Sequence, residues 1–111
     1  MTDRELLEAA AKAAGLEPFN AWGKTFVMGD GSPPKAEWNP LTDDGDALRL
    51  AVKLRVDFMT TGHLIDGTEV VSVIFPVNGD CDSISEPHGS DPYAATRRAI
   101  VRAAAAMGEK A

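Results

Sequence analysis

Several residue types are scarce in this chain, and each shortage excludes a class of protein. Cys81 is the single cysteine among 111 residues, which rules out an internal disulfide framework and fits a reducing compartment. Lysine and arginine number 11 against 17 acidic residues. The resulting net charge of −6 disfavours nucleic-acid binding, which depends on cations that neutralise phosphates.

Long apolar runs are also missing, and we expect no secretory leader. No apolar stretch approaches the roughly 20 residues that cross a bilayer, so we expect no membrane segment. The first residues carry acid where a signal peptide needs a basic region, and we therefore expect a cytoplasmic protein. The length and the 44% apolar composition predict a single domain spanning residues 1–111.

Three segments have the spacing and the caps of helices. Residues 2–5 form a capping box of the S/T-x-x-E type, and a helix follows as far as Gly15. Thr42 is the expected N-cap of the second helix, and Pro92 begins a third that runs to about Met107. The predicted buried residues are Leu48, Ala51, Val52 and Val56 on the second helix, and Thr96, Ile100, Ala103, Ala104 and Met107 on the third.

Two pairs of strands are predicted between these helices. Residues 22–28 are strand-like, the turn formers of 29–34 follow, and residues 36–39 are the expected second arm of a hairpin. Residues 56–59 and 69–75 form the other pair, with a turn that includes His63.

The strand at 69–75 is apolar on both faces, which favours a sheet covered by helices on both sides. Residues 77–91 are polar, show no periodicity and are expected to form a connection. The prediction is therefore an α+β fold, with a small antiparallel sheet packed between three helices in the order α-β-β-α-β-β-α.

No catalytic residue, cofactor site or metal site can be assigned from the sequence, so a non-enzymatic protein is expected. Asn78-Gly79-Asp80-Cys81-Asp82 resembles the start of a calcium loop, but the later ligand positions do not match. Cys81, His63 and His88 are zinc-ligand types without the spacing of a zinc motif, and their roles stay open.

Four residues are candidates for an interface. Trp22 and Trp38 are the aromatic candidates, because aromatic side chains supply much of the energy of protein contacts, although both could equally belong to the core. Arg98 and Arg102 form, with Arg97, a basic flank of the third helix. Three arginines are a small footprint for nucleic acid. A homodimer through the alanine-rich third helix or a strand edge is a further candidate.

Three stretches together resemble a known family: the opening helix that ends in Ala-Ala-Gly, residues 38–51 (WNPLTDDGDALRLA) and residues 91–104 (DPYAATRRAIVRAA). They are similar to the phage alpha-beta-alpha sandwich domain, a family of small phage and prophage proteins. The resemblance implies helices on both sides of a small antiparallel sheet and an origin in a bacteriophage or prophage genome. It implies no catalytic residues.

These observations lead to two hypotheses of different classes. The first is a phage or prophage accessory protein that binds a host or phage protein in the bacterial cytoplasm and catalyses nothing. The alternative is a domain that binds a small molecule or a metal through a loop at residues 78–88, since loops on rigid scaffolds often carry function.

Overall fold

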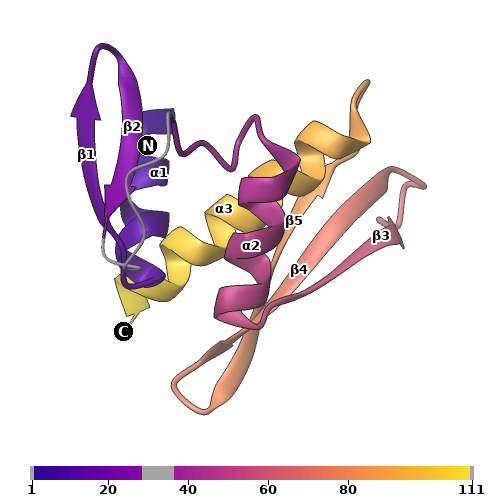
Figure 1. The fold of residues 1–111 in the computed structure, drawn as a ribbon. Helices are drawn as coiled ribbons and strands as arrows, with labels where there is room; N and C mark the ends of the chain where they lie inside the picture. Colours follow the sequence, from indigo (N-terminus) through magenta and orange to yellow (C-terminus); the bar gives the residue numbers. More distant parts are fainter. Residues whose placement is uncertain (1, 29–36, 111) are drawn as a thin grey trace.

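The computed structural model describes residues 2–28 and 37–110, in which three helices and five strands follow one another (Figure 1). This confirms the predicted α+β class with three helices and antiparallel strands. The strands form two separate sheets, one of two strands and one of three. The helices are α1 (Asp3–Ala13), α2 (Asp44–Leu54) and α3 (Pro92–Lys110), and the strands are β1 (Glu17–Ala21), β2 (Lys24–Met28), β3 (Asp57–His63), β4 (Glu69–Val77) and β5 (Asp80–Pro87).

Helix α3 is the centre of the fold. It contacts α1, α2 and all three strands of the larger sheet, and it passes diagonally between them in Figure 1. Its many alanines explain this position, because small side chains allow neighbours to approach a helix closely from several sides. Ile100, Ala103 and Ala104 are buried as predicted, whereas Thr96 and Met107 are half-buried.

Helix α1 begins with the predicted capping box. The Thr2 hydroxyl accepts a hydrogen bond from the Glu5 amide at 3.2 Å and donates to the Glu5 carboxylate at 3.1 Å. The helix packs closely against the end of α3, where a Cβ added to Gly108 would lie 3.3 Å from the Cβ of Ala13. A side chain at this position would therefore push the two helices apart.

Two predictions for α2 are wrong. The N-cap is Asp43 rather than Thr42, and its carboxylate accepts a hydrogen bond from the Asp46 amide at 2.7 Å. Leu48 and Val52 were expected inside but are 56% and 69% exposed. Helix α2 contacts α3 and buries a side on which two alanines accompany Leu50, because small side chains let two helices approach closely. Its buried residues are Asp46, Ala47, Leu50 and Ala51.

The first hairpin uses different arms from those predicted. Strands β1 and β2 are joined by Trp22 and Gly23, so the expected single strand at 22–28 starts with a turn. The turn predicted at 29–34 lies outside the described residues, as does residue 36, and residues 37–39 form no strand. A Trp-Gly turn is harder to recognise than the Asn-Gly turn that usually marks a tight hairpin.

The larger sheet has the order β3-β4-β5 and contains one strand more than predicted. Residues 80–87, expected as part of a loop, form β5 and pair with β4 along its whole length. Its polar composition hid this strand, since only Ile84 supplies a large apolar side chain. The turn expected around His63 is also wrong, because β3 continues through this residue.

The two faces of the larger sheet differ in how completely other parts of the protein cover them. The face formed by Val71, Val73 and Phe75 is buried, and α3 packs against this strand. On the opposite face Val70 is buried, but Ile74 is 40% exposed. The expectation that the strand at 69–75 is covered by helices on both faces is therefore wrong for this second face. The apolar residues there are enclosed partly by neighbouring strands, as where Val70 lies against Gly62.

Candidate protein-binding surface

The hairpin of β1 and β2 ends in a tight turn of unusual composition. Trp22 and Gly23 are its two central residues, and their φ angles are 51° and 72°. A type I′ turn requires positive φ at both positions, and its right-handed twist suits the flanking strands. Glycine adopts this conformation freely, but for tryptophan it is strained. The turn therefore holds a large aromatic residue where a small or polar one is preferred.

Three aromatic rings gather on the outer face of this hairpin. Phe19 and Phe26 are register partners, and their rings stack with centroids 5.2 Å apart and planes at 14°. Trp22 meets Phe26 edge-on at 6.5 Å and 83°. Trp22 is 91% exposed and Phe19 is 38% exposed. We refer to Phe19, Trp22 and Phe26 as the aromatic hairpin surface.

The other face of the hairpin is fixed to the rest of the protein. Asn20 donates to the Glu8 carboxylate of α1 at 2.7 Å and accepts from the hydroxyl of buried Thr25 at 2.9 Å. The Trp38 amide donates to the Thr25 carbonyl at 2.8 Å, and Val27 packs against the core. These contacts fix the hairpin that carries the three rings to the rest of the protein. The hairpin is therefore ordered before a partner binds, and binding costs little further conformational entropy.

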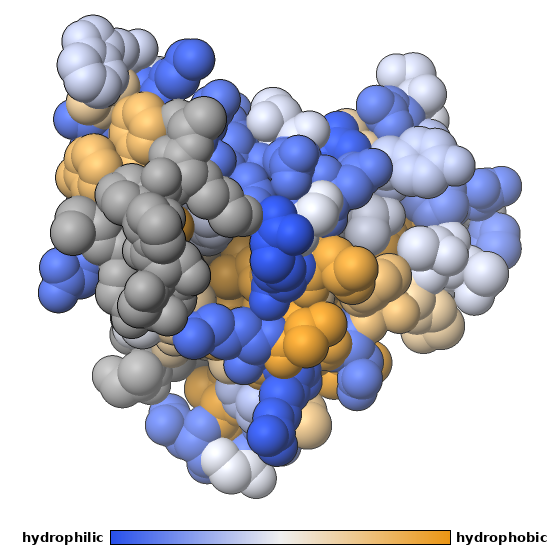
Figure 2. Space-filling view, in the orientation of Figure 1, coloured by the Kyte–Doolittle hydropathy of each residue, from blue (hydrophilic) through white to orange (hydrophobic). Residues whose placement is uncertain are grey.

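A second group of exposed apolar side chains lies on α2 and the start of β3. Leu48, Val52 and the 44% exposed Phe58 belong to it, and Figure 2 shows hydrophobic surface over this part of the molecule. Hydrophilic residues interrupt the area in the same view. Unlike the aromatic hairpin surface, it contains no tryptophan or tyrosine, the residues most enriched among binding hot spots.

Of the four predicted interface residues, only Trp22 lies freely on the surface. Trp38 is 5% exposed and belongs to the core. Arg98 donates to Asp3 of α1 at 3.0 Å, and Arg102 donates to Glu86 of β5 at 2.6 Å. Both arginines therefore tie neighbouring elements to α3 within the protein.

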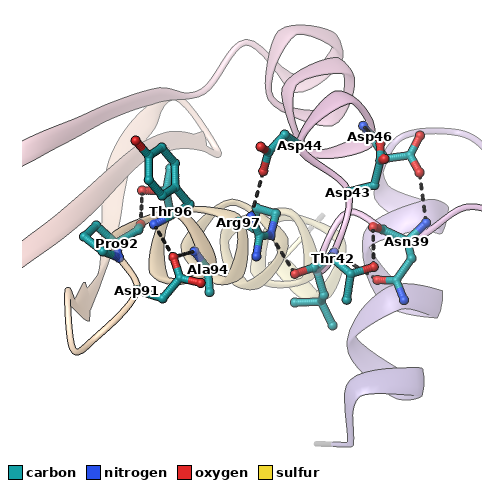
Figure 3. Close-up of polar contacts among 12 residues, drawn as sticks. Asn39, Thr42, Asp43, Asp44, Asp46, Asp91, Pro92, Ala94, Thr96 and Arg97 are labelled. Atoms are coloured by element: carbon teal, nitrogen blue, oxygen red, sulfur yellow. Dashed lines mark hydrogen bonds and ion pairs between the residues drawn. The ribbon is translucent and has the colours of Figure 1, made fainter.

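Arg97 completes this arrangement. Its Nε donates to the Leu41 carbonyl at 2.8 Å, and its guanidinium pairs with Asp44 of α2 at 2.7 Å (Figure 3). The three arginines that sequence analysis grouped as a basic flank thus connect α3 to three different elements. Each has an acidic partner, which reduces the positive charge that a nucleic acid would meet.

Polar residues also surround a cleft of about 280 Å³ at the start of α2, lined by Glu37, Asn39, Thr42, Asp43 and Asp46. Buried Asp46 accepts from the Asn39 amide at 3.0 Å and pairs with Arg49 at 2.7 Å. Figure 3 shows the bond between Asn39 and Asp46 beside Thr42 and Asp43. The cleft is built from helix capping and turn contacts, and such acids stabilise a helix N-terminus in their own right.

The proposed ligand loop at residues 78–88 is not a loop, since β5 occupies most of it. Cys81 is exposed near the start of β5, whereas His88 follows its end and lies 3.3 Å from Glu69. His63 is the register partner of Glu69 on the other side of β4, so Cys81 is far from both histidines along the sheet. Among the residues that the structure describes, no three histidine, cysteine, aspartate or glutamate side chains are placed to hold a metal ion.

The sequence analysis missed Phe19 and Phe26 as part of the candidate surface. The signal that could have found them is the pair of segments EPFNA and KTFVM, which place a phenylalanine at equal distance on either side of Trp22-Gly23. Residues equidistant from a two-residue turn face each other across a hairpin. Reading Trp-Gly as a turn would therefore have predicted the stacked rings.

Comparisons with known proteins identify no relative of this chain. Within the described ranges, no helix has the length and apolar character needed to cross a membrane. No protein-family model, curated protein or solved structure matches the chain.

Proposed function

We propose that this protein is a non-enzymatic binding protein that recognises a partner protein through its aromatic hairpin surface. The observation that carries the proposal is the state of Trp22, which is 91% exposed although its φ of 51° is strained for tryptophan. Neither the backbone conformation nor the exposure favours tryptophan at this position for stability. Strained residues that the rest of the structure holds in place cluster at functional sites.

The energies at this position support binding as the reason for the residue. A left-handed conformation costs a residue with a Cβ roughly 1–2 kcal/mol. The edge contact with Phe26 returns about 0.5–1.5 kcal/mol at most, and less where the ring is mostly in water. A buried tryptophan at a protein interface contributes about 2 kcal/mol or more. Contact with a partner is therefore large enough to offset the strain, whereas in the free protein the mostly solvated contact with Phe26 returns less than the strain costs.

The cellular location and the kind of partner are proposed from the sequence resemblance to phage proteins. A phage or prophage accessory protein acting in the bacterial cytoplasm would meet a host or phage protein as its partner. The net charge of −6 supports a partner with a basic surface around the aromatic contact, because opposite charges increase the rate of association.

The proposal is tested by affinity capture from bacterial lysate with the wild-type protein and two single variants. Trp22→Asn removes the ring with a residue that suits the turn, and Leu48→Ala is the matched control because it removes an exposed apolar side chain from the other hydrophobic area. We expect a partner that is captured by wild type and Leu48→Ala and lost with Trp22→Asn.

Titration of the purified partner then measures the effect. We expect Trp22→Asn to weaken binding at least ~30-fold, as for an interface hot spot, with the circular dichroism spectrum unchanged. The proposal is wrong if no partner is captured above background, or if the partner is lost with Leu48→Ala and kept with Trp22→Asn.

A further inference from the structure

Strand β5 lies at the edge of the larger sheet, and no strand of residues 2–28 or 37–110 pairs with its outer side. In an antiparallel pair, hydrogen-bonded and non-hydrogen-bonded residue pairs alternate. Pro76 has no N–H and faces Cys81, so this pair is of the second kind. By alternation, Ser83 and Ser85 are also non-hydrogen-bonded toward β4. The amides of Cys81, Ser83 and Ser85 therefore point to the free edge.

Two of these three amides already have acceptors within the strand. The Asp80 carboxylate accepts from the Cys81 amide at 2.8 Å, and the Asp82 carboxylate accepts from the Ser83 amide at 2.8 Å. Each aspartate thus accepts a hydrogen bond from the outward-pointing amide of the residue that follows it. We propose that Asp80 and Asp82 close the free edge of β5 against strand pairing with a second copy of this chain.

The geometry of such pairing shows what the two carboxylates prevent. Two copies of β5 related by a two-fold axis at Ser83 would form an antiparallel pair over residues 80–86. Ser83 would pair with Ser83 of the second copy, and Cys81 with its Ser85, which requires the amides of Cys81 and Ser83 as donors. These donors are occupied, and an edge whose amides are satisfied gains less from pairing.

Electrostatic repulsion between the two copies also opposes pairing of their β5 strands. In the same two-fold arrangement Asp80 lies opposite Glu86 of the second copy, at a non-hydrogen-bonded pair, where side chains are closest. Like charges directly opposite are destabilising. Arg102, bound to Glu86 at 2.6 Å, offsets part of this repulsion, so the occupied amides carry most of the protection.

The opposite edge of the sheet is protected by another device. Strand β3 contains a register shift between Met59 and Gly62, and such bulges twist an edge away from continuous pairing. Strand β5 pairs with β4 from Asp80 to Pro87 without a shift, so its backbone is regular enough to accept a further strand. The carboxylates are needed on this edge because its shape offers no protection.

The test compares the association of three double variants with wild type, under reducing conditions so that Cys81 cannot cross-link copies. Asp80→Ala/Asp82→Ala removes both acceptors, and Asp80→Asn/Asp82→Asn removes the charge but keeps an oxygen acceptor. Glu17→Ala/Glu37→Ala is the control, because it changes the net charge of −6 by the same two units at exposed positions away from β5. Light scattering during gel filtration measures the mass, and amide exchange follows Cys81 and Ser83.

We expect the alanine pair to reach twice the 11.8 kDa chain mass with rising concentration, and to dimerise at least ~10-fold more tightly than wild type or the control. Slower exchange at Cys81 and Ser83 in the dimer would place its interface on β5. The asparagine pair should stay close to wild type. The proposal is overturned if the alanine pair remains monomeric, if its dimer leaves these amides unprotected, or if the asparagine pair dimerises equally well.

Discussion

Arg97 of α3 donates a hydrogen bond from Nε to the carbonyl of Leu41, 56 residues earlier in the chain, at 2.8 Å. The same guanidinium reaches Asp44 in the first turn of α2, so one side chain fixes both the entry to α2 and its position on α3. The Arg97 side chain is 17% exposed and its bond to the Leu41 carbonyl is partly buried, whereas its partner Asp44 is exposed. A shielded arginine of this kind contributes more to stability than an exposed ion pair.

The Arg97→Ala variant should lower the free energy of unfolding by about 1–3 kcal/mol, because it leaves a partly buried carbonyl without its donor. Arg98→Ala is the matched control on the same helix, and its more exposed pair with Asp3 should contribute less than about 1 kcal/mol. Urea unfolding measures both values. An equal loss in the two variants would contradict this account of Arg97.

Replacing Trp22 should stabilise the free protein while it removes the proposed binding. Asparagine is favoured in a type I′ turn, so Trp22→Asn relieves about 1–2 kcal/mol of strain and loses a ring contact of about 0.5 kcal/mol. We expect a net gain of roughly 1 kcal/mol, measured by thermal unfolding. Trp22→Ala keeps the strain without the ring and should give no gain. Stabilisation by both substitutions alike would show that strain is not the source.

Trp38 should behave as a core residue in the same measurement. Trp38→Ala removes a side chain that is 5% exposed and should cost about 3–5 kcal/mol, because it leaves a cavity between the hairpin and the helices. Trp38→Phe fills part of that space and should cost less. If Trp38→Ala changed stability by less than about 1 kcal/mol, its assignment to the core would be wrong.

Asp66 provides a prediction that depends on pH. The hydroxyl and amide of Thr68 donate to its carboxylate, the amide at 2.9 Å, and they lower the pKa of Asp66 below its ordinary value of 3.8. A lowered pKa means that the charged form stabilises the fold above pH 3.8, and that this contribution is lost as the pH falls through the folded-state pKa.

The Thr68→Val variant lacks the donating hydroxyl, so the pKa of Asp66 should rise toward 3.8. Carboxyl chemical shifts of Asp66, followed by NMR across this pH range in wild type and variant, measure the change. An unchanged Asp66 titration in the variant would show that the hydroxyl does not cause the shift.

Local signals were enough to predict much of the fold. The Thr2–Glu5 capping box, the proline start of α3 and the β-branched run of β4 each depend on neighbours within a few residues, and all three are present. Strand β5 also had a local signal, because the two-residue turn that joins it to β4 is Asn78-Gly79, with φ angles of 51° and 81°. Its mostly polar and exposed side chains concealed the strand that follows this turn.

The candidate site was predicted only in part. Trp22 could be singled out by residue type, but Trp38 has the same type and lies in the core. Residue type alone cannot distinguish them, because burial depends on which segment packs into the core, and Trp38 does so whereas Trp22 lies in the hairpin turn. The arginines Arg98 and Arg102 were likewise predicted as surface charges, and their acidic partners lie on elements far away in sequence.

The sequence by itself determined the α+β class and the three helices, because helix caps and apolar periodicity act over short distances. Only the tertiary structure decided which face of α2 is buried and that Trp38 lies in the core while Trp22 lies on the surface. These outcomes depend on packing between segments that are distant in the sequence, and such contacts leave no periodic trace in the residues that make them.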